Sequence, residues 1–260
     1  MAGQADWLLT GVIMSITDPQ ELAGLRAAGA VVRLMLNAMR AAVRVGVTTA
    51  ELDDVGAKVM REHGARSAPQ LVYKFPGVNC ISVNDEAVHG IPSRRALVDG
   101  DLLKLDVTIE KDGFMADAAE SVPVGAAPEP VQRLIACAER AFTKSMLVAR
   151  AGFRVSEIGR VVEREVRRSG FSVIRDLGGH GIGRTIHEEP RVPNYPDPNA
   201  PQILTEGLVI TVEPIIAAGS GRSVLSSDGW TVRTADRQPS AHYEHTLVIT
   251  KGEPILLTAA

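Results

Sequence analysis

Apolar residues recur at alternating spacings of three and four over residues 18–45. This spacing draws one stripe along a helix, so the segment is predicted to be a long amphipathic helix. Thr17 or Asp18 can cap its start, and Pro19 suits its first turn because an N–H there would be unpaired anyway. The residues of the stripe are Leu22, Leu25, Gly29, Val32, Leu36, Met39 and Val43.

Helical pairs occur in both halves of the sequence. A capping box of Thr48 and Glu51 begins a second helix, and Gly64 ends it. The same two elements are predicted again at residues 130–150 and 156–169. The second helix of each pair lies between glycines at the same interval, with Glu and then an aliphatic residue at the same place. The chain is therefore predicted to contain an internal duplication.

The duplication extends to two carboxylates that follow apolar strands. Asp106 lies six residues after Gly100, and Glu213 lies six residues after Gly207. Each therefore occupies the equivalent position of its half. A pseudo-twofold axis that pairs the two strands would bring one carboxylate from each half to a shared site.

Apolar runs between and after the helices predict strands at residues 80–84, 102–110, 208–216 and 242–250. In the second of these runs, side chains alternate between the two faces of the strand. One set faces the helices, and Asp106 lies on the opposite face, directed into a cleft. The helix-facing set is Leu103, Leu105, Val107 and Ile109. Residues 190–201 contain five prolines and are predicted to be a loop, because proline breaks both helix and sheet.

These elements predict an α+β fold in which helices lie outside a curved, largely antiparallel sheet. The inner face of that sheet would hold the site. We expect a tail at residues 1–13 and then a single domain at residues 14–260. The two duplicated halves of this domain are about 14–125 and 126–260.

Composition restricts the classes of function. Hydrophobic residues make up 45% of the chain, charged residues 23%, and the net charge is −3, values that are ordinary for a globular protein. This charge gives no case for binding nucleic acid or an anionic membrane, and no apolar run is expected to span a bilayer. Two cysteines, Cys80 and Cys137, cannot make a disulfide framework, so a reducing cytoplasm is the expected setting.

Four carboxylates stand beside apolar strands or glycine and proline: Asp106, Asp117, Glu213 and Glu244. Together they carry a charge of −4, which two divalent cations would balance. Bringing them together without cations would cost several kcal/mol, because like charges repel strongly in a poorly solvated site. The turn residues at 111–113 lie between Asp106 and Asp117, so a hairpin can present both side chains to the same ions.

One histidine joins this set and two others remain for catalysis. His180 lies among four glycines, which we expect to form a tight bend that aims its side chain. Carboxylates with one imidazole suit Co, Mn, Fe or Zn ions. His89 and His187 are the two remaining imidazoles near glycine and proline. We expect the other histidines to be structural or at the surface: His63, His242 and His245.

Apolar side chains near these motifs are candidates for the wall of a pocket. They are Tyr73, Phe75, Cys80, Ile186 and Trp230. Taken one at a time, each is equally compatible with an ordinary core position.

With these residues in place, the chain resembles type I methionine aminopeptidases, short cytosolic enzymes with a pita-bread fold. The resemblance extends from about Met14 to Leu257. It is strongest in the segment 73–84 that leads to His89, in Gly179-His180-Gly181-Ile182-Gly183 with His187, and in the closing motif at 240–246. It implies metal ligands at Asp106, Asp117, His180, Glu213 and Glu244, and therefore two divalent ions.

The resemblance also implies roles for the remaining residues. Glu213 would move the proton from the attacking water to the leaving amine, His187 would stabilise the oxyanion, and His89 would hydrogen-bond the scissile amide nitrogen. The five apolar candidates would form the methionine pocket. The family commonly has an aromatic residue where this chain has Ile186, which puts strict methionine preference in doubt.

The resemblance implies that the substrates are N-termini of peptides or of nascent chains at the ribosome, with small second residues preferred. It also implies a monomeric enzyme that acts in the cytoplasm. No nucleic acid or membrane partner is expected. Two alternatives share the fold. A proline-specific aminopeptidase uses the same ligand types but usually carries a large extra N-terminal domain, and a non-catalytic pita-bread binding protein typically loses ligands.

Overall fold

The computed structural model describes residues 13–259. The predicted tail at residues 1–13 therefore lies outside the described residues except for its last position. The first half contains, in chain order, α1 (Pro19–Ala42), α2 (Thr49–Glu62), β1 (Arg66–Ser67), α3 (Ala68–Tyr73), β2 (Cys80–Val83), β3 (Glu86–Val88), β4 (Leu102–Lys111) and β5 (Phe114–Pro123). The second half contains α4 (Glu129–Ser145), α5 (Val155–Arg168), β6 (Ser172–Val173), β7 (Gly178–Gly181), β8 (Glu188–Pro193), β9 (Val209–Val212), β10 (Ile215–Ala217), β11 (Ser223–Leu225), β12 (Val232–Thr234), β13 (Ser240–His242), β14 (His245–Val248) and β15 (Ile255–Leu256).

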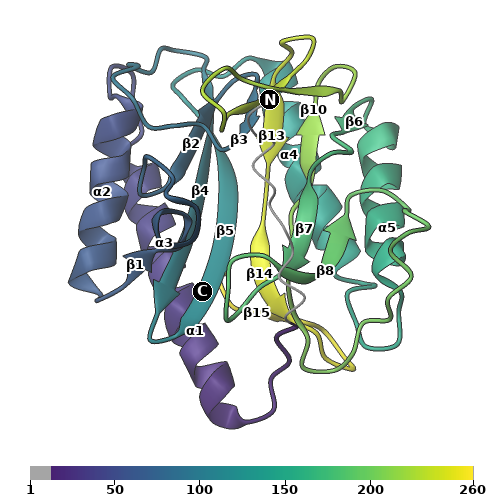
Figure 1. Ribbon diagram of the computed structural model, residues 1–260. Helices are drawn as coiled ribbons and strands as arrows, with labels where there is room; N and C mark the ends of the chain where they lie inside the picture. The colour runs from purple at the N-terminus through teal and green to yellow at the C-terminus, as the bar shows by residue number, and fades with distance from the viewer. Residues whose placement is uncertain (1–12, 260) are drawn as a thin grey trace.

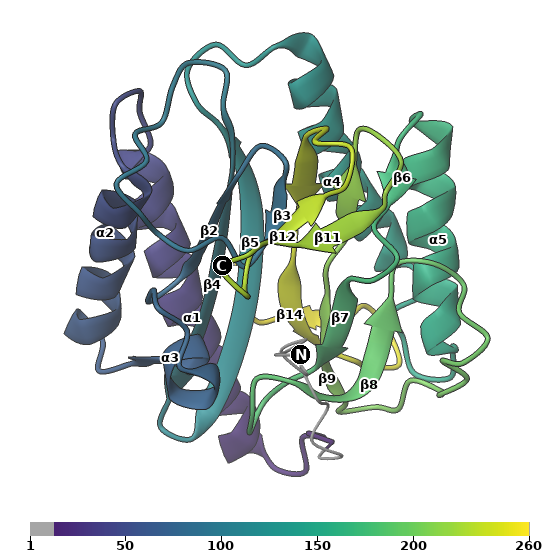
Figure 2. The ribbon, with the colours of Figure 1, turned by 45° about the horizontal axis from the view of Figure 1, so that its top comes forward.

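Two helix pairs cover the outside of the strands. Figure 1 shows α1 and α2 on one side and α4 and α5 on the other, with the strands of both halves between them. Within residues 13–259 every strand pairing is antiparallel, and the strands form four separate sheets. The small sheet of β11, β12 and β3 joins the halves across the middle, as Figure 2 shows. The α+β class with helices outside is thus as predicted.

The helices of the first half form where their caps and apolar stripes predict. The Asp18 side chain accepts hydrogen bonds from the N–H groups of Gln20 and Glu21 at the start of α1, and the capping box of Thr48 and Glu51 is present in α2. The stripe of α1 packs with the alternating apolar residues of β4, which are completely buried. That burial leaves Asp106 on the opposite face of β4, as its position in the alternation predicted.

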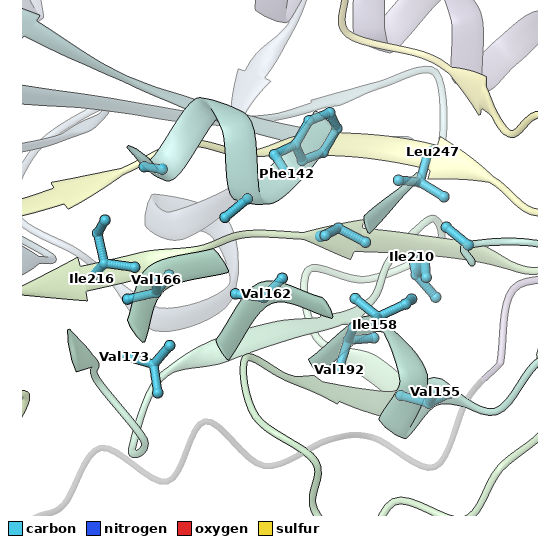
Figure 3. Close-up of a cluster of buried hydrophobic side chains, with 14 of the residues drawn as sticks. Phe142, Val155, Ile158, Val162, Val166, Val173, Val192, Ile210, Ile216 and Leu247 are labelled. Atoms are coloured by element: carbon cyan, nitrogen blue, oxygen red, sulfur yellow. The ribbon is translucent and has the colours of Figure 1, made fainter. Parts of the chain in front are cut away.

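The second half builds its core in the same way. Phe142 of α4 and Val162 of α5 pack against Ile210 of β9 and Leu247 of β14, and all four are at most 4% exposed (Figure 3). The cluster fills the space between the helix pair and the sheet. Burying apolar side chains of this size is what holds the helices on the strands.

Hydrogen bonds confirm that the halves are duplicates. Gly46 N–H donates to the carbonyl of Leu97 at 2.8 Å, and Gly152 N–H donates to that of Leu204 at 2.9 Å. Gly100 and Gly207, the glycines that precede the two carboxylate strands, likewise donate to residues 124 and 249, both at 2.9 Å. Equivalent positions in the two sequences therefore occupy equivalent positions in the structure.

Two predicted strands are in fact broken. The segment 208–216 divides into β9 and β10 at Glu213 and Pro214, and the segment 242–250 is interrupted between His242 and His245. The two parts of each segment belong to different sheets. Pro214 has no N–H for a ladder hydrogen bond, which favours a break there. Glu213 and Glu244 lie in these breaks.

The proline-rich segment is only partly a loop. Its first residues form β8, which pairs with β7 at the edge of the five-stranded sheet, so the prediction of a loop over 190–201 is wrong for 190–193. An edge strand tolerates Pro190 and Pro193 because one of its sides needs no ladder hydrogen bonds. The short helix α3 was not anticipated.

Helix α1 corrects the expectation that no apolar run can span a bilayer. By length and composition alone it is apolar enough to cross a membrane. A single such helix is weak evidence, since the core helix of a globular protein passes the same test. Here its apolar stripe is buried against β4 and α2.

Candidate active site

A cavity of about 580 Å³ opens on the inner faces of the strands. It collects the residues that the sequence singled out for chemistry, from both halves of the chain. Its wall includes Tyr73, Phe75, Cys80, His89, Asp106, Asp117, His180, Ile186, His187, Glu213, His242 and Glu244. Trp230 does not line it. Its ring instead stands edge-on behind Phe75, with centroids 5.3 Å apart and planes at 82°, so the expected pocket role of Trp230 is indirect.

The hairpin of β4 and β5 presents the first two carboxylates. Asp117 pairs across the hairpin with Thr108, and Asp106 pairs with Ala119. The chain turns between the strands at Asp112, whose φ of 51° is left-handed, and at the glycine that follows. Both carboxylates face the cavity, as the predicted hairpin requires.

The other two carboxylates are held at the strand breaks by bonds between the halves. Glu244 N–H donates to the Ala119 carbonyl at 2.9 Å. Asp117 N–H donates to Thr246 Oγ1 at 2.8 Å, and that hydroxyl donates back to the Asp117 carbonyl at 2.8 Å. These bonds tie β5 to the segment around β14. Carboxylates from positions far apart in sequence therefore meet.

The glycines around His180 have a different role from the one predicted. Gly178, Gly179 and Gly181 lie in strand β7 rather than in a tight bend, and only Gly183, which follows the strand, has a positive φ. A Cβ at Gly179 would lie 2.4 Å from the Thr211 carbonyl oxygen, and one at Gly181 would lie 2.1 Å from that of Glu189. The glycines are thus required because neighbouring backbone passes too close for any side chain.

His180 is oriented by its own backbone. Nδ1 lies 2.8 Å from the Gly181 carbonyl oxygen, an acceptor, so Nδ1 carries the ring proton and donates. Nε2 is left with its lone pair and stands 3.6 Å from Glu213 Oε1. Burial lowers the pKa of His180 to about 4, which keeps the ring neutral. A neutral imidazole with a free Nε2 lone pair is the form that binds metal.

The pKa values of the four carboxylates show that it is unfavourable to bury them together in their charged form. Burial raises the pKa of Asp117 to about 7, and burial with the neighbouring charge of Asp117 raises that of Glu213 to about 8. The pKa values of Asp106 and Glu244 are raised well above the ordinary value by burial first and then by the charges of the other carboxylates. The site therefore favours positive charge beside these groups.

The donor set fits divalent cations. Asp117, His180 and Glu244 offer ligand atoms within 4.8 Å of one another, and so do Glu213, His242 and Glu244. Asp117 Oδ1 and Glu244 Oε1 are buried, and neither has a hydrogen-bond partner among the described residues. Buried oxygens without partners, together with the raised pKa values, are the features expected of carboxylates that bind cations.

The remaining two catalytic candidates lie beside this cluster. His187 stacks edge-on to His180 with ring centroids 4.2 Å apart, and its Nδ1 lies 2.5 Å from the hydroxyl oxygen of Tyr73. Burial lowers the pKa of His89 to about 4 and that of His187 well below its ordinary value. Both rings are therefore neutral near pH 7 and can offer an N–H to a substrate.

His242 was wrongly expected to be structural or at the surface. It is only 2% exposed, lines the cavity, and holds Nε2 at 3.3 Å from Glu244 Oε2. Burial, then the nearby charges of His89 and Lys104, lower its pKa to about 3. Its spacing of two residues from Glu244 was a usable signal, since alternate residues of an extended chain share a face.

The other two histidines are placed as predicted. His245 is buried, with Nδ1 at 2.8 Å from Thr258 Oγ1, and is structural. His63 is exposed and lies at the C-terminal cap of α2. Neither lines the cavity.

The chain is similar to known metallopeptidases over most of its length. The model of metallopeptidase family M24 matches residues 23–251. Methionine aminopeptidase 2 of Bacillus subtilis (strain 168) is 46% identical over 247 residues, which cover 94% of this chain and 99% of that protein. A methionine aminopeptidase of Clostridium perfringens (strain 13 / Type A) is 39% identical over 243 residues, covering 94% of this chain and 98% of that protein.

Solved structures extend the comparison to the fold. The methionine aminopeptidase from Thermotoga maritima superposes with a TM-score of 0.92 at 31% identity, covering 95% of this chain and 100% of that one. The prolidase from Pyrococcus furiosus gives a TM-score of 0.77 at 20% identity, covering 95% of this chain and 66% of that one, and so shares the fold alone. The predicted pita-bread fold is confirmed.

Proposed function

This chain belongs to metallopeptidase family M24, and on that premise we propose that it is a methionine aminopeptidase that removes Met from the N-termini of peptides and nascent proteins. The observation that carries the proposal is the meeting of four carboxylates and His180 with two neutral imidazoles, His89 and His187, around one cavity. This combination supplies metal ligands and hydrogen-bond donors beside the apolar residues that line the same cavity.

Two divalent ions, of Co, Mn, Fe or Zn, would be held by Asp106, Asp117, His180, Glu213 and Glu244. Four carboxylates match the charge of two such ions. Burial first, and then the charges of the neighbouring carboxylates, raise the pKa values of these groups, which supports the need for cations beside them. When bound, divalent ions lower the pKa of water to supply a nucleophile at neutral pH and hold the substrate amine.

The residues of this chain then move the protons and stabilise charge. Glu213 accepts a proton from the attacking water and passes it to the leaving amine nitrogen. A ring N–H of His187 donates to the oxygen that becomes negative at the substrate carbonyl. His89 hydrogen-bonds the amide nitrogen of the bond that breaks.

The side chain of the first substrate residue would enter the apolar part of the cavity. Tyr73, Phe75, Cys80 and Ile186 line it, and Trp230 supports Phe75 from behind. An unbranched thioether suits a narrow apolar pocket because it is flexible and polarizable. Ile186 is smaller than an aromatic residue, so we propose that Leu or norleucine is also accepted at a modest rate. Bulky second residues would be poor substrates because the reacting carbonyl lies deep in the cleft.

The proposal extends to the setting of the enzyme. We propose a monomer that acts in the cytoplasm on nascent chains at the ribosome. The support is the absence of a disulfide framework and of a charge that favours membranes or nucleic acid. Sedimentation of the purified protein tests the monomer, and co-sedimentation with ribosomes tests the association.

A three-peptide panel tests the function: Met-Ala-Ser, Leu-Ala-Ser and Ala-Pro-Ser, each assayed for release of the first residue. We expect the fastest release from Met-Ala-Ser, and none after exhaustive chelation until Co²⁺, Mn²⁺ or Fe²⁺ is restored. Fastest release from Ala-Pro-Ser would instead establish a proline-specific enzyme. No release from any peptide by metal-loaded protein would indicate a binding protein.

A further inference from the structure

His242 is a buried imidazole that the proposed mechanism does not use. It is 2% exposed, and neither ring nitrogen has a hydrogen-bond partner among residues 13–259. Its backbone is fixed on both sides: its N–H donates to Ser121 Oγ at 2.9 Å, that hydroxyl donates to the His242 carbonyl at 2.9 Å, and Ile215 is its strand partner. The ring is therefore held in place with its nitrogens unsatisfied.

Nε2 of this ring faces two carboxylate oxygens. It lies 3.3 Å from Glu244 Oε2 and 3.7 Å from Glu213 Oε2. Both distances exceed the range of roughly 2.7–3.2 Å for N–H···O hydrogen bonds. Ligands about 2.0–2.2 Å from a common ion stand roughly 3.0–3.6 Å apart at ordinary coordination angles. The distance to Glu244 falls within that range, and the distance to Glu213 lies just above it.

The same spacing recurs on the other oxygen of Glu213. Glu213 Oε1 lies 3.6 Å from Nε2 of His180, the imidazole expected to bind metal. One carboxylate thus has an imidazole nitrogen facing each of its oxygens. The two imidazoles come from β7 and β13, which belong to different sheets.

We propose that His242 is an additional ligand of the metal centre, in which Nε2 binds an ion together with Glu213 and Glu244. The inference rests on the proposed function only in requiring a divalent metal in this cavity. The centre then has two imidazoles instead of one. Because imidazole suits Zn²⁺, Co²⁺ and Fe²⁺ better than Mn²⁺, His242 would favour the former ions.

Titration of metal-free protein with Co²⁺, followed by calorimetry and by the visible spectrum of the ion, tests the proposal. We expect His242→Gln to lower the affinity for Co²⁺ by roughly tenfold or more and to change the spectrum, with a smaller loss for Mn²⁺. His63→Gln, which removes an exposed histidine outside the cavity, should match the wild type. An unchanged affinity and spectrum in His242→Gln would overturn the proposal.

X-ray absorption of the Co²⁺-loaded wild-type protein gives an answer that needs no variant. Two imidazoles in the centre support the proposal, and one imidazole overturns it. If the metal centre contains one imidazole and the protein still releases Met from Met-Ala-Ser, this inference is overturned and the proposed function is left intact. Failure of the wild type to take up any Co²⁺, Mn²⁺ or Fe²⁺ would overturn both.

Discussion

The hydroxyl oxygen of Tyr73 lies 2.5 Å from Nδ1 of His187 and joins α3 to the segment between β7 and β8. Burial raises the pKa of Tyr73 to about 12, so the phenol keeps its proton at neutral pH. When the phenol donates to Nδ1, the single ring proton of neutral His187 stands on Nε2. Tyr73 is therefore more than a pocket wall: it sets which nitrogen of His187 can donate to a substrate.

Tyr73→Phe keeps the ring and removes this hydrogen bond. We expect kcat to fall by roughly tenfold or more with little change in KM, because outer partners that orient a functional imidazole are typically worth 10–100-fold. Nitrogen NMR of labelled histidine should show His187 changing from one tautomer to a mixture. Tyr195→Phe removes another tyrosine hydroxyl, bonded to Asp197 away from the cavity, and should leave both readouts unchanged.

Substituting either catalytic histidine should lower activity without loss of metal, which distinguishes these two residues from the metal ligands. His89→Ala and His187→Ala are each expected to lower kcat by roughly 10²-fold, because each removes a hydrogen bond made in the transition state. Metal content measured by elemental analysis should stay near that of the wild type. Loss of metal in either variant would mean that a ligand has been mistaken for a catalytic residue.

The raised pKa of Glu213 predicts how the metal-free protein responds to pH. Its pKa of about 8 lies above the ordinary value of 4.5, so the fold holds a proton that the unfolded chain releases. The stabilisation that depends on this proton is complete below the ordinary pKa and is lost as pH rises toward 8.

Glu213→Gln makes that loss measurable, since an amide stays neutral. In the metal-free state, the Tm of the variant minus the Tm of the wild type should increase from pH 5 to pH 9. The effect of exposed carboxylates on Tm is the same in both proteins and cancels in this difference. Adding Mn²⁺ should stabilise the wild type more at pH 8 than at pH 5, because ligands bind metal when deprotonated. A difference in Tm that does not change with pH would contradict the prediction. The variant should also lose most of its activity.

Ile186 is expected to control the strictness of the pocket. Ile186→Phe should lower the rate on Leu-Ala-Ser relative to Met-Ala-Ser, by a factor that corresponds to about 1–3 kcal/mol, the range for one apolar pocket contact. The ratio of the two kcat/KM values is the measurement. An unchanged ratio would show that Ile186, which is 4% exposed and lines the cavity, does not contact the substrate side chain.

Gly181→Ala should destabilise the fold. The added Cβ would lie 2.1 Å from the Glu189 carbonyl oxygen, and backbone cannot move aside without breaking the pairing of β7 and β8. We expect a loss of roughly 1–3 kcal/mol or more in the free energy of unfolding by urea. Gly252→Ala is the matched control, because the nearest atom to its Cβ would be 3.9 Å away. Equal stability of the two variants would disprove the packing role.

The sequence alone determined the four long helices, the duplication and most of the candidate site. Helix α1 has a stripe and a cap that depend only on local spacing, and such periodic patterns survive any tertiary arrangement. The hairpin carrying Asp106 and Asp117 was readable because its turn lies between them. Family motifs supplied His89, His180 and His187.

Other features of the candidate site are not predicted by local sequence patterns and were determined only by the tertiary structure. Glu213 and Glu244 lie in breaks between strands of different sheets, and the pairing of β13 with β10 brings His242 to Glu213. The glycines around His180 read as a bend in sequence, whereas neighbouring backbone requires them in a strand. Periodicity specifies which face of an element is apolar. Contacts between residues far apart in the sequence depend on how those faces are packed together, and this is why the contacts of Tyr73 with His187 and of His242 with Glu213 appear only in the folded chain.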